Sequence, residues 1–453
     1  MDSPQTSTPS EDDPTPLEQA ILRLRGPVLC GICLLGAMCY AGNVQRKSDQ
    51  GYQLSSVEQF VQHVNEVPEQ AYGILSEQNR PSTTNQIQPD APEEEHFVVG
   101  VDSIPINKDY LYSIYDPASE EFVVRLQNLK SKEIIQEWRV AYHILSDLYQ
   151  EWLADEKPNY EMYGSRLHSR VPKRALGVPT LLSDGRVTVM VGRMLVCLEQ
   201  DGHVAWSVNS IYHHSTEVDH EGNLWICSML PNPGGAYRQD AIVQLAAATG
   251  QTLYTKSILE IFRENPAFDL SHLNNTEDDP FHLNDVQPVF TDTDYWKRGD
   301  LLISLRNIST VLLYRPSTGR VLWSNSTFWA NQHDVCVVDD HRISVFDNNV
   351  LRRLFSTKEF KTGKHNRCMI YDFETGQAGQ HFAEIYEAEN IASPTQGRLK
   401  WFAKEHILYV EPADQFFFVV ADLDANKSYK CVVPGYHPGK VGDVVWFRLL
   451  DKR

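Results

Sequence analysis

The sequence predicts an all-β fold, a six-bladed β-propeller, preceded by a single N-terminal transmembrane helix. Three hairpins share one plan: an apolar strand, a Thr-Gly turn and a second strand, with the turns at 249–250, 318–319 and 375–376. A more apolar pair of strands precedes each hairpin, so each unit has about four strands and recurs roughly every 45–70 residues. Units of this size are typical of propeller blades, which are four-stranded sheets around a central axis. An uncharged stretch at 26–45 predicts the helix.

The remaining blades follow the same pattern. Segments 109–140 and 400–433 have alternating strands and turns, which brings the count to about six blades over residues 96–453. The terminal stretch 441–450 is expected to add a strand to the first blade and close the ring, because closure removes exposed sheet edges. Residues 141–157 predict a helical insertion after the first blade.

The N-terminal part has a different character. Residues 1–25 are rich in Pro, Ser, Asp and Thr, which predicts a disordered tail. Residues 26–45 are long enough to cross a bilayer, which takes about 20 apolar residues. A cleaved signal peptide is the alternative, but its leading region is short and basic, whereas this one is preceded by a long acidic tail. We therefore expect an uncleaved signal anchor, followed at 46–95 by a linker with a short helix.

Charge and cysteine content exclude several classes of function. The formal net charge of −19 argues against a general binder of nucleic acids or anionic membranes, since both need a basic face. A local basic pocket for an anionic substrate stays possible. The cysteines after the anchor show neither a CxxC pair nor metal-ligand spacing, so we expect buried single thiols and no zinc site or disulfide framework. They are Cys197, Cys227, Cys336, Cys368 and Cys431.

Three histidines hold the same place in the repeat. His214, His282 and His333 each lie four residues before a valine at the start of an inner strand. Inner strands of a propeller converge on the axis, so residues that begin equivalent strands meet in space. One such histidine is more often a structural residue, but packing gives no reason for three. The repetition predicts three imidazoles around one axis, with His213 facing the opposite side of its strand.

Arg306 adds a positive charge to this set. It sits in an apolar strand that follows His282, and a buried guanidinium needs an anionic partner. A structural ion pair is the simpler alternative. Three histidines can bind zinc, but an arginine disfavours a dication, so we expect an oxyanion site with no metal and no cofactor. A neutral imidazole in such a site can act as a nucleophile.

Four stretches carry a resemblance to a known family. They are DPFHLNDVQP, GDLLISLRNISTVLLYRPSTGRVLW, QHDVCVVDDHRISVFDNN and YDFETG. They resemble the PAPS-independent arylsulfotransferases, or aryl-sulfate sulfotransferases, and more closely the membrane-anchored members. The resemblance covers roughly residues 96–453 and is strongest over 205–376. It implies a six-bladed periplasmic propeller that moves a sulfuryl group from an aryl sulfate to a phenol by a ping-pong route through a sulfohistidine.

The resemblance also implies roles for single residues. His333 would be the nucleophile, His282 and Arg306 would hold the sulfuryl oxygens, and His214 would do the same or exchange a proton with the phenols. Weaker candidates for substrate binding or support of the site are Asn284, Asn307, Asp347 and Asn348. The acidic tail, the anchor, the insertion near 141–175 and the lack of a candidate disulfide depart from the family pattern.

Two other functions are compatible with a propeller. One is a non-catalytic domain that binds a partner or an anionic ligand, since fold alone does not fix function. The other is a calcium-dependent hydrolase, which needs acids around the channel, but the acids before His282 fall mostly in one loop. The transferase interpretation predicts small aryl sulfates and phenols as partners, with membrane attachment through the anchor and no nucleic acid. It places the domain outside the cytoplasm, in a bacterial periplasm or in a eukaryotic lumen or extracellular space. The sequence gives no oligomeric state.

Overall fold

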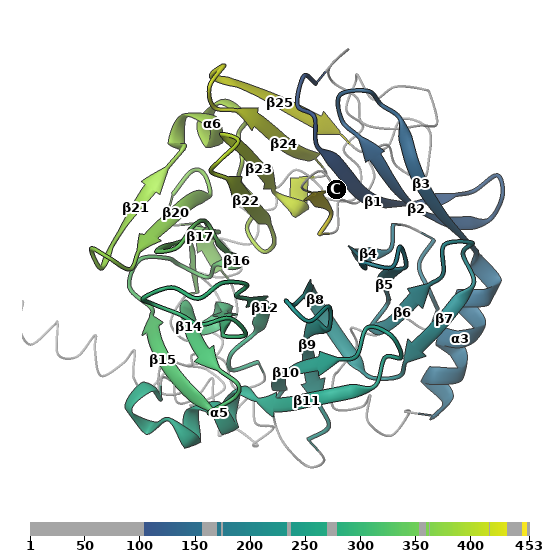
Figure 1. The fold of residues 1–453 in the computed structure, drawn as a ribbon, viewed down its shortest axis with the longest axis horizontal. Helices are drawn as coiled ribbons and strands as arrows, with labels where there is room; N and C mark the ends of the chain where they lie inside the picture. The colour runs from purple at the N-terminus through teal and green to yellow at the C-terminus, as the bar shows by residue number, and fades with distance from the viewer. Residues whose placement is uncertain are drawn as a thin grey trace, which may run out of the picture. The chain divides into compact units, whose positions relative to one another are not determined.

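The computed structural model describes residues 104–155, 170–173, 175–232, 237–269, 279–352, 359–361, 363–415, 417–432 and 446–450. These residues form six four-stranded antiparallel sheets arranged as blades around a central axis (Figure 1). The predicted six-bladed β-propeller is therefore confirmed.

In five blades the strands follow the chain from the axis outwards. The second and third blades are β4 (Gly177–Leu181), β5 (Val187–Val191), β6 (Met194–Leu198), β7 (Val204–Val208), then β8 (Ile211–Val218), β9 (Leu224–Leu230), β10 (Gln239–Leu245), β11 (Thr252–Ser257). The fourth is β12 (Leu283–Pro288), β13 (Leu301–Leu305), β14 (Thr310–Arg315), β15 (Arg320–Asn325). The fifth is β16 (His333–Val337), β17 (Arg342–Asp347), β20 (Arg367–Asp372), β21 (Gln377–His381), and the sixth is β22 (Arg398–Phe402), β23 (Ile407–Glu411), β24 (Phe417–Asp422), β25 (Lys427–Val432).

The first blade joins segments from both ends of the propeller. Its inner strand is β26 (Arg448–Leu450), followed by β1 (Asp109–Asp116), β2 (Glu121–Asn128) and β3 (Ile134–Ala141). The pairing is antiparallel, with Asp109 opposite Leu450. The expected closure of the ring by the terminal strand is confirmed, and β26 covers the edge of β1 that faces the axis.

The Thr-Gly repeats mark the outer hairpins of three blades. Gly250, Gly319 and Gly376 adopt φ angles of 73°, 67° and 67° between the third and fourth strands. A residue with a Cβ is disfavoured in this left-handed region, so glycine recurs at the turn. The repeated Thr-Gly pair therefore reflects the backbone conformation that these turns require.

The core lies between neighbouring blades. Trp225 and Ile242 of the third blade, for example, pack against Leu301 and Leu312 of the fourth. All five cysteines named above are buried and unpaired, as expected.

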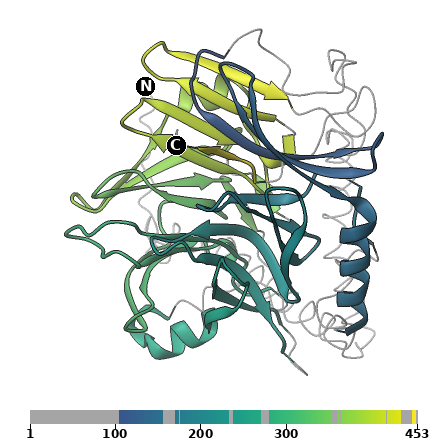
Figure 2. The same ribbon diagram turned by 45° about the vertical axis from the view of Figure 1, so that its right-hand side comes forward.

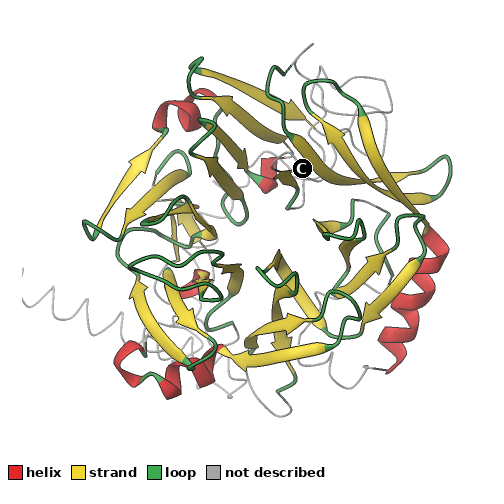
Figure 3. Cartoon of the chain, in the orientation of Figure 1, coloured by secondary structure: helices red, strands yellow, loops and turns green. Residues whose placement is uncertain are grey.

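The three α-helices lie at the outer rim of the ring, whereas some short 3-10 turns lie nearer its centre (Figure 3). The segment 141–157 contains α3 (Tyr142–Asp155), which runs beside the first two blades (Figure 2) and buries Leu145, Tyr149 and Trp152 completely. The other short elements are α5 (Ile258–Glu264), α6 (Ala383–Ala388), the 3-10 turns η2 (Pro266–Phe268), η4 (Arg306–Ile308) and η5 (Ala413–Gln415), and the hairpin β18 (Val350–Arg352) with β19 (Glu359–Lys361).

No helix in the described part of the chain is long and apolar enough to cross a membrane. The predicted tail at 1–25, the anchor at 26–45 and the linker helix within 46–95 all lie outside the described residues.

Candidate active site

Three consecutive blades bring His214, His282 and His333 together at the axis. The ring centroids are 5.1 Å apart for His214 and His282, 5.9 Å for His214 and His333, and 6.3 Å for His282 and His333. One nitrogen from each ring lies within 4.8 Å of the others. The cluster expected from the sequence is therefore formed.

A chain of hydrogen bonds between blades defines which residues are equivalent. In each case a backbone N–H of one inner strand donates to the side chain of the preceding blade. The acceptors are Ser215, Asp285 and Asp334, and the donors are Val286, Val335 and Leu399, at 3.1, 2.8 and 2.9 Å. Ser215, Asp285 and Asp334 thus occupy one position of the repeat.

This register corrects the alignment by valines. The residues just before the three acceptors are His214, Asn284 and His333, so Asn284 and not His282 holds the equivalent place. His282 lies two residues earlier, before β12 begins. It still reaches the cluster, with its backbone in the left-handed region at φ 50°. Asn284 itself is buried and donates to the backbone oxygen of Gln332 at 2.8 Å.

The strand β8 is irregular at the histidines. The pairing with β9 shifts between His213 and Thr216, and His214 has φ 56°. A bulge of this kind breaks the alternation of side chains along a strand. As a result Nδ1 of His213 lies 2.8 Å from Nδ1 of His214. The expectation that His213 faces away from the site is wrong.

His333 has its tautomer fixed by Asn348. The Asn348 amide nitrogen donates to the backbone oxygens of Ser393 and Gln396 at 3.0 and 3.3 Å. Its Oδ1 therefore faces His333 Nδ1, at 2.6 Å, and can only accept. The proton of His333 sits on Nδ1, and Nε2 carries a lone pair. That Nε2 is buried and has no hydrogen-bond partner among the described residues.

Arg306 and His282 are held by the loop before β12. His282 Nδ1 lies 2.5 Å from Oδ2 of Asp279. Asn307 donates to the backbone oxygen of Asp279 at 2.5 Å and accepts from Arg306 Nη1 at 3.2 Å. Arg306, at the start of η4, is only 3% exposed. Asn307 and Asp279 therefore support the side chains that face the site.

Asp347 has a different place. It accepts from the backbone N–H groups of Ala330 and Asn349 at 2.8 and 3.0 Å and pairs with Arg367 at 2.5 Å. These contacts fix the backbone at Ala330, shortly before His333, and at Asn349, directly after Asn348. Asp347 thus supports the site through the backbone.

Burial sets the charge of the cluster. It lowers the pKa of His214 and of His333 well below 6.5, and nearby positive charge, including Arg306 beside His333, lowers it further. The pKa of His282 is lowered by burial too, although Asp279 opposes the effect. All three imidazoles are then neutral at pH 7, and the guanidinium groups of Arg193, Arg238 and Arg306 lie around them. A site with a net positive charge favours an anion, and Arg306 disfavours a metal cation between the three rings.

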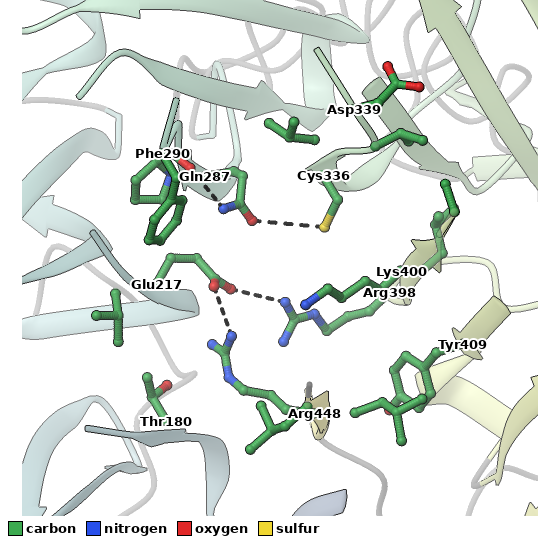
Figure 4. Close-up of a pocket in the computed structure, with 18 of the residues that line it drawn as sticks. Thr180, Glu217, Gln287, Phe290, Cys336, Asp339, Arg398, Lys400, Tyr409 and Arg448 are labelled. Atoms are coloured by element: carbon green, nitrogen blue, oxygen red, sulfur yellow. Dashed lines mark hydrogen bonds and ion pairs between the residues drawn. The ribbon is translucent and has the colours of Figure 1, made fainter. Parts of the chain in front are cut away.

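On the other side of Trp446 from the histidines, Glu217, Asp285 and Asp334 of three blades lie near Arg398, and Glu217 also pairs with Arg448. Figure 4 shows Glu217 between Arg398 and Arg448, with distances of 3.0 and 2.8 Å. Arg398 also pairs with Asp334 at 3.1 Å. The acids at the axis are therefore spread over several blades, contrary to the expectation that they fall mostly in one loop. The arginines neutralise them, so they do not form an open calcium site.

Trp446 separates the histidines from the cavity in Figure 4. Its ring lies 5.9 Å from the His214 ring on one side and 5.0 Å from Arg398 Cζ on the other. Arg398 lines a cavity of about 1110 Å³, together with Glu217, Arg448 and the exposed Phe290. Much of its lining comes from the ends of the inner strands β4, β8, β12 and β16, whereas His214 and His333 lie nearer the beginnings of β8 and β16.

Asp285 gives a testable pH dependence. Burial and then the charge of Asp334 raise its pKa to about 8. The unfolded chain loses this proton near pH 4, so the contribution of Asp285 to stability is complete below about pH 4 and is lost as the pH rises through 8. Asp285→Asn, which imitates the protonated acid, should make the free energy of unfolding depend less on pH, by roughly one to a few kcal/mol between pH 5 and 8.5. Urea unfolding at both pH values measures this. Asp147→Asn, at an exposed position of α3, is the control, and equal pH dependence in wild type and Asp285→Asn contradicts the assignment.

Residues 197–419 match the family model described as Arylsulfotransferase (ASST). The matched segment contains the three clustered histidines and Arg306 and runs from the second blade into the sixth. The match confirms the resemblance that the motifs indicated, whereas the membrane-anchored subgroup stays a prediction. No curated protein matches the chain.

Several solved structures resemble the chain distantly. A protein of unknown function from Bacteroides caccae is 10% identical, with 71% of this chain and 93% of that chain covered and a TM-score of 0.40. Kuenenia stuttgartiensis hydrazine synthase is 12% identical, with 72% and 81% covered and a TM-score of 0.39. A streptogramin B lyase is 9% identical, with 73% and 85% covered and a TM-score of 0.37. Likeness at this level carries no argument about function.

Proposed function

Because residues 197–419 have the sequence of an arylsulfotransferase domain, we propose that this chain transfers a sulfuryl group from an aryl sulfate to a phenol. The observation that carries the proposal is Nε2 of His333. This nitrogen is buried and neutral. The tautomer that Asn348 enforces puts the proton on Nδ1, so Nε2 keeps a lone pair that no described residue engages. It faces the other two histidines of the cluster, and the guanidinium of Arg306 is close enough to lower the pKa of His333.

The first half-reaction follows from this geometry. The Nε2 lone pair attacks the sulfur of the donor, the bond from sulfur to the aryl oxygen breaks, and a phenolate leaves. Arg306 supplies paired donors to the sulfuryl oxygens. His282 adds a third donor only in its protonated form, which the negative charges of the bound aryl sulfate and of Asp279 favour. Asp279 holds His282 through Nδ1, so Nε2 is the atom of His282 that meets the sulfuryl group. The product is a sulfohistidine at His333.

The second half-reaction returns the group to an acceptor. The oxygen of a second phenol attacks the sulfur, the bond to Nε2 breaks, and His333 recovers its lone pair. Donor and acceptor bind in turn, which is a ping-pong mechanism. The donor itself brings the sulfuryl group, so no PAPS, metal or other cofactor takes part in this proposal.

The setting in the cell is part of the proposal. The uncharged segment 26–45 supports a single-pass anchor, and the family resemblance supports a propeller outside the cytoplasm. We propose that small aryl sulfates and phenols are the partners, at a membrane surface.

The test uses the full chain with 4-nitrophenyl sulfate, without PAPS or added metal. With the donor alone, we expect one equivalent of nitrophenol per active chain and a sulfuryl group that mass spectrometry maps to His333. Adding a phenol should then give continuous release. Continuous release without acceptor but with a required metal would indicate a hydrolase. A folded chain that neither releases nitrophenol nor carries the label, over a range of aryl sulfates, would support a binding propeller.

A further inference from the structure

The side chains Asp240, His213 and His214 form a buried line that ends in the histidine cluster. Asp240 Oδ1 lies 3.6 Å from His213 Nε2, and His213 Nδ1 lies 2.8 Å from His214 Nδ1. Asp240 and His213 are completely buried. Neither residue belongs to the cluster expected from the sequence, and the family resemblance gave them no role.

Proton positions along the line follow from the charges. Two imidazoles joined through Nδ1 atoms share one proton, so one donates and the other accepts. The anion at Asp240 favours a proton on the facing Nε2 of His213. Burial lowers the pKa of His213 to about 4, so His213 is neutral and its Nδ1 is then the acceptor. His214 must donate from Nδ1, which leaves a lone pair on its Nε2.

The surrounding charges support this direction. Burial and the charge of Asp279 raise the pKa of Asp240, but Arg238, which lies 3.2 Å away, and His213 lower it more. The pKa of Asp240 is therefore lowered overall, and its carboxylate stays ionised. Arg193 adds positive charge beside both histidines. From the other blades, His214 faces His282 and His333, which are neutral, and the ring of Trp446. Asp240 is therefore the anion at the outer end of the line.

We infer that Asp240 and His213 orient His214 as the base that takes the proton of the acceptor phenol. The inference rests on the proposed sulfuryl transfer. As the phenol oxygen attacks the sulfur on His333, the O–H proton moves to Nε2 of His214, the S–O bond forms and the N–S bond breaks. His214 is then an imidazolium whose Nδ1–H still bonds to His213. It gives the proton to the phenolate that the next donor releases, so protons balance over one cycle.

This arrangement predicts a selective defect. A phenol with a pKa near 10 is neutral at pH 8 and needs a base. At that pH 4-cyanophenol is partly ionised and 4-nitrophenol largely ionised, so these acceptors depend little on a base. In His213→Leu, we expect transfer from the sulfated enzyme to unsubstituted phenol to slow by about 10- to 100-fold. Transfer to the acidic phenols, and labelling of His333 by 4-nitrophenyl sulfate, should change by less than about 3-fold. His213→Asn, which offers a carbonyl near the Nδ1 position, should restore most of the loss.

A second measurement reads the proton directly. Nitrogen-15 chemical shifts of histidine-labelled full chain report which ring nitrogen of His214 is protonated, without any turnover. We expect the Nδ1–H form in the wild type and in His213→Asn, and its loss in His213→Leu. The Nε2–H form in the wild type would overturn the relay, as would an equal slowing of all acceptors or no slowing at all. If His214 has the expected tautomer but the chain forms no sulfohistidine, the proposed function is refuted. The hydrogen-bonded line Asp240–His213–His214 would then exist without the catalytic role inferred for it.

Discussion

Replacing His333 by alanine is expected to lower kcat for sulfuryl transfer by at least about 10⁴-fold and to abolish covalent labelling, because removal of an enzyme's nucleophile leaves only binding and electrostatic contributions. His333 combines a tautomer fixed by Asn348 with a buried Nε2 that has no hydrogen-bond partner among the described residues. Steady-state release of nitrophenol with an acceptor, together with mass spectrometry of the intact chain, measures both effects. The KM for the donor should change little, since Arg306 and His282 remain.

The matched control is His203→Ala. His203 lies in a turn of the second blade, with 83% of its side chain exposed, and should keep full activity. His333→Gly adds a chemical test, because it leaves room for free imidazole, which should restore part of the release. If His333→Ala retained labelling or more than about one hundredth of the activity, the nucleophile would have to be another residue.

Removing residues 446–453 is expected to have the largest effect on stability. Trp446, Phe447 and Leu449 are buried, and each buried side chain of this kind contributes about 1.5–3 kcal/mol. The truncation also uncovers the inner edge of β1. Single domains are stable by only about 5–15 kcal/mol, so the truncated chain should lack a cooperative urea transition or show a much lower midpoint.

Leu253→Ala provides the comparison for this truncation. Leu253 lies on the outer strand β11 with half of its surface exposed, so this change should shift the midpoint only slightly. A truncated chain with the wild-type midpoint would show that the ring does not depend on β26. Far-ultraviolet circular dichroism and size-exclusion chromatography would show whether loss of the strand exposes β1 to aggregation.

The fold could be predicted because its signals are local. The turn glycines at 250, 319 and 376 take backbone angles that other residues disfavour, and they recur in the same place of three blades. The apolar inner strands give the second signal. Their spacing was enough to predict the blades, the closing strand and the meeting of three histidines at the axis.

The register of the inner strands could not be read from the valines. Val286 is equivalent to Thr216 and Val335, not to Val218 and Val337, because a bulge begins each of these strands at a different point. A better signal was present in the residues Ser215, Asp285 and Asp334. Each is a short hydrogen-bonding side chain that accepts from the next blade, and a search for that role would have aligned Asn284 with the histidines.

The contribution of His213 was hidden for the same reason. Strand alternation places neighbouring side chains on opposite faces, and only the bulge at His214 turns both rings together. Asp240 comes from another strand, and its meeting with His213 depends on the packing of β10 in the sheet. Likewise, Asn348 looks like a turn residue until its two carbonyl partners are seen. Such contacts depend on tertiary structure.

The position of Trp446 has a consequence for the order of events during synthesis. The segment that closes the ring also carries Trp446, whose ring packs against His214. Its strand β26 pairs with β1, which leaves the ribosome more than 300 residues earlier. Five blades can form while the chain is still growing, but the surroundings of the clustered histidines are complete only after residue 450 has joined the first blade. A nascent or truncated chain would therefore be expected to be inert, and catalytic competence would arise in a single late step that reports completion of the ring.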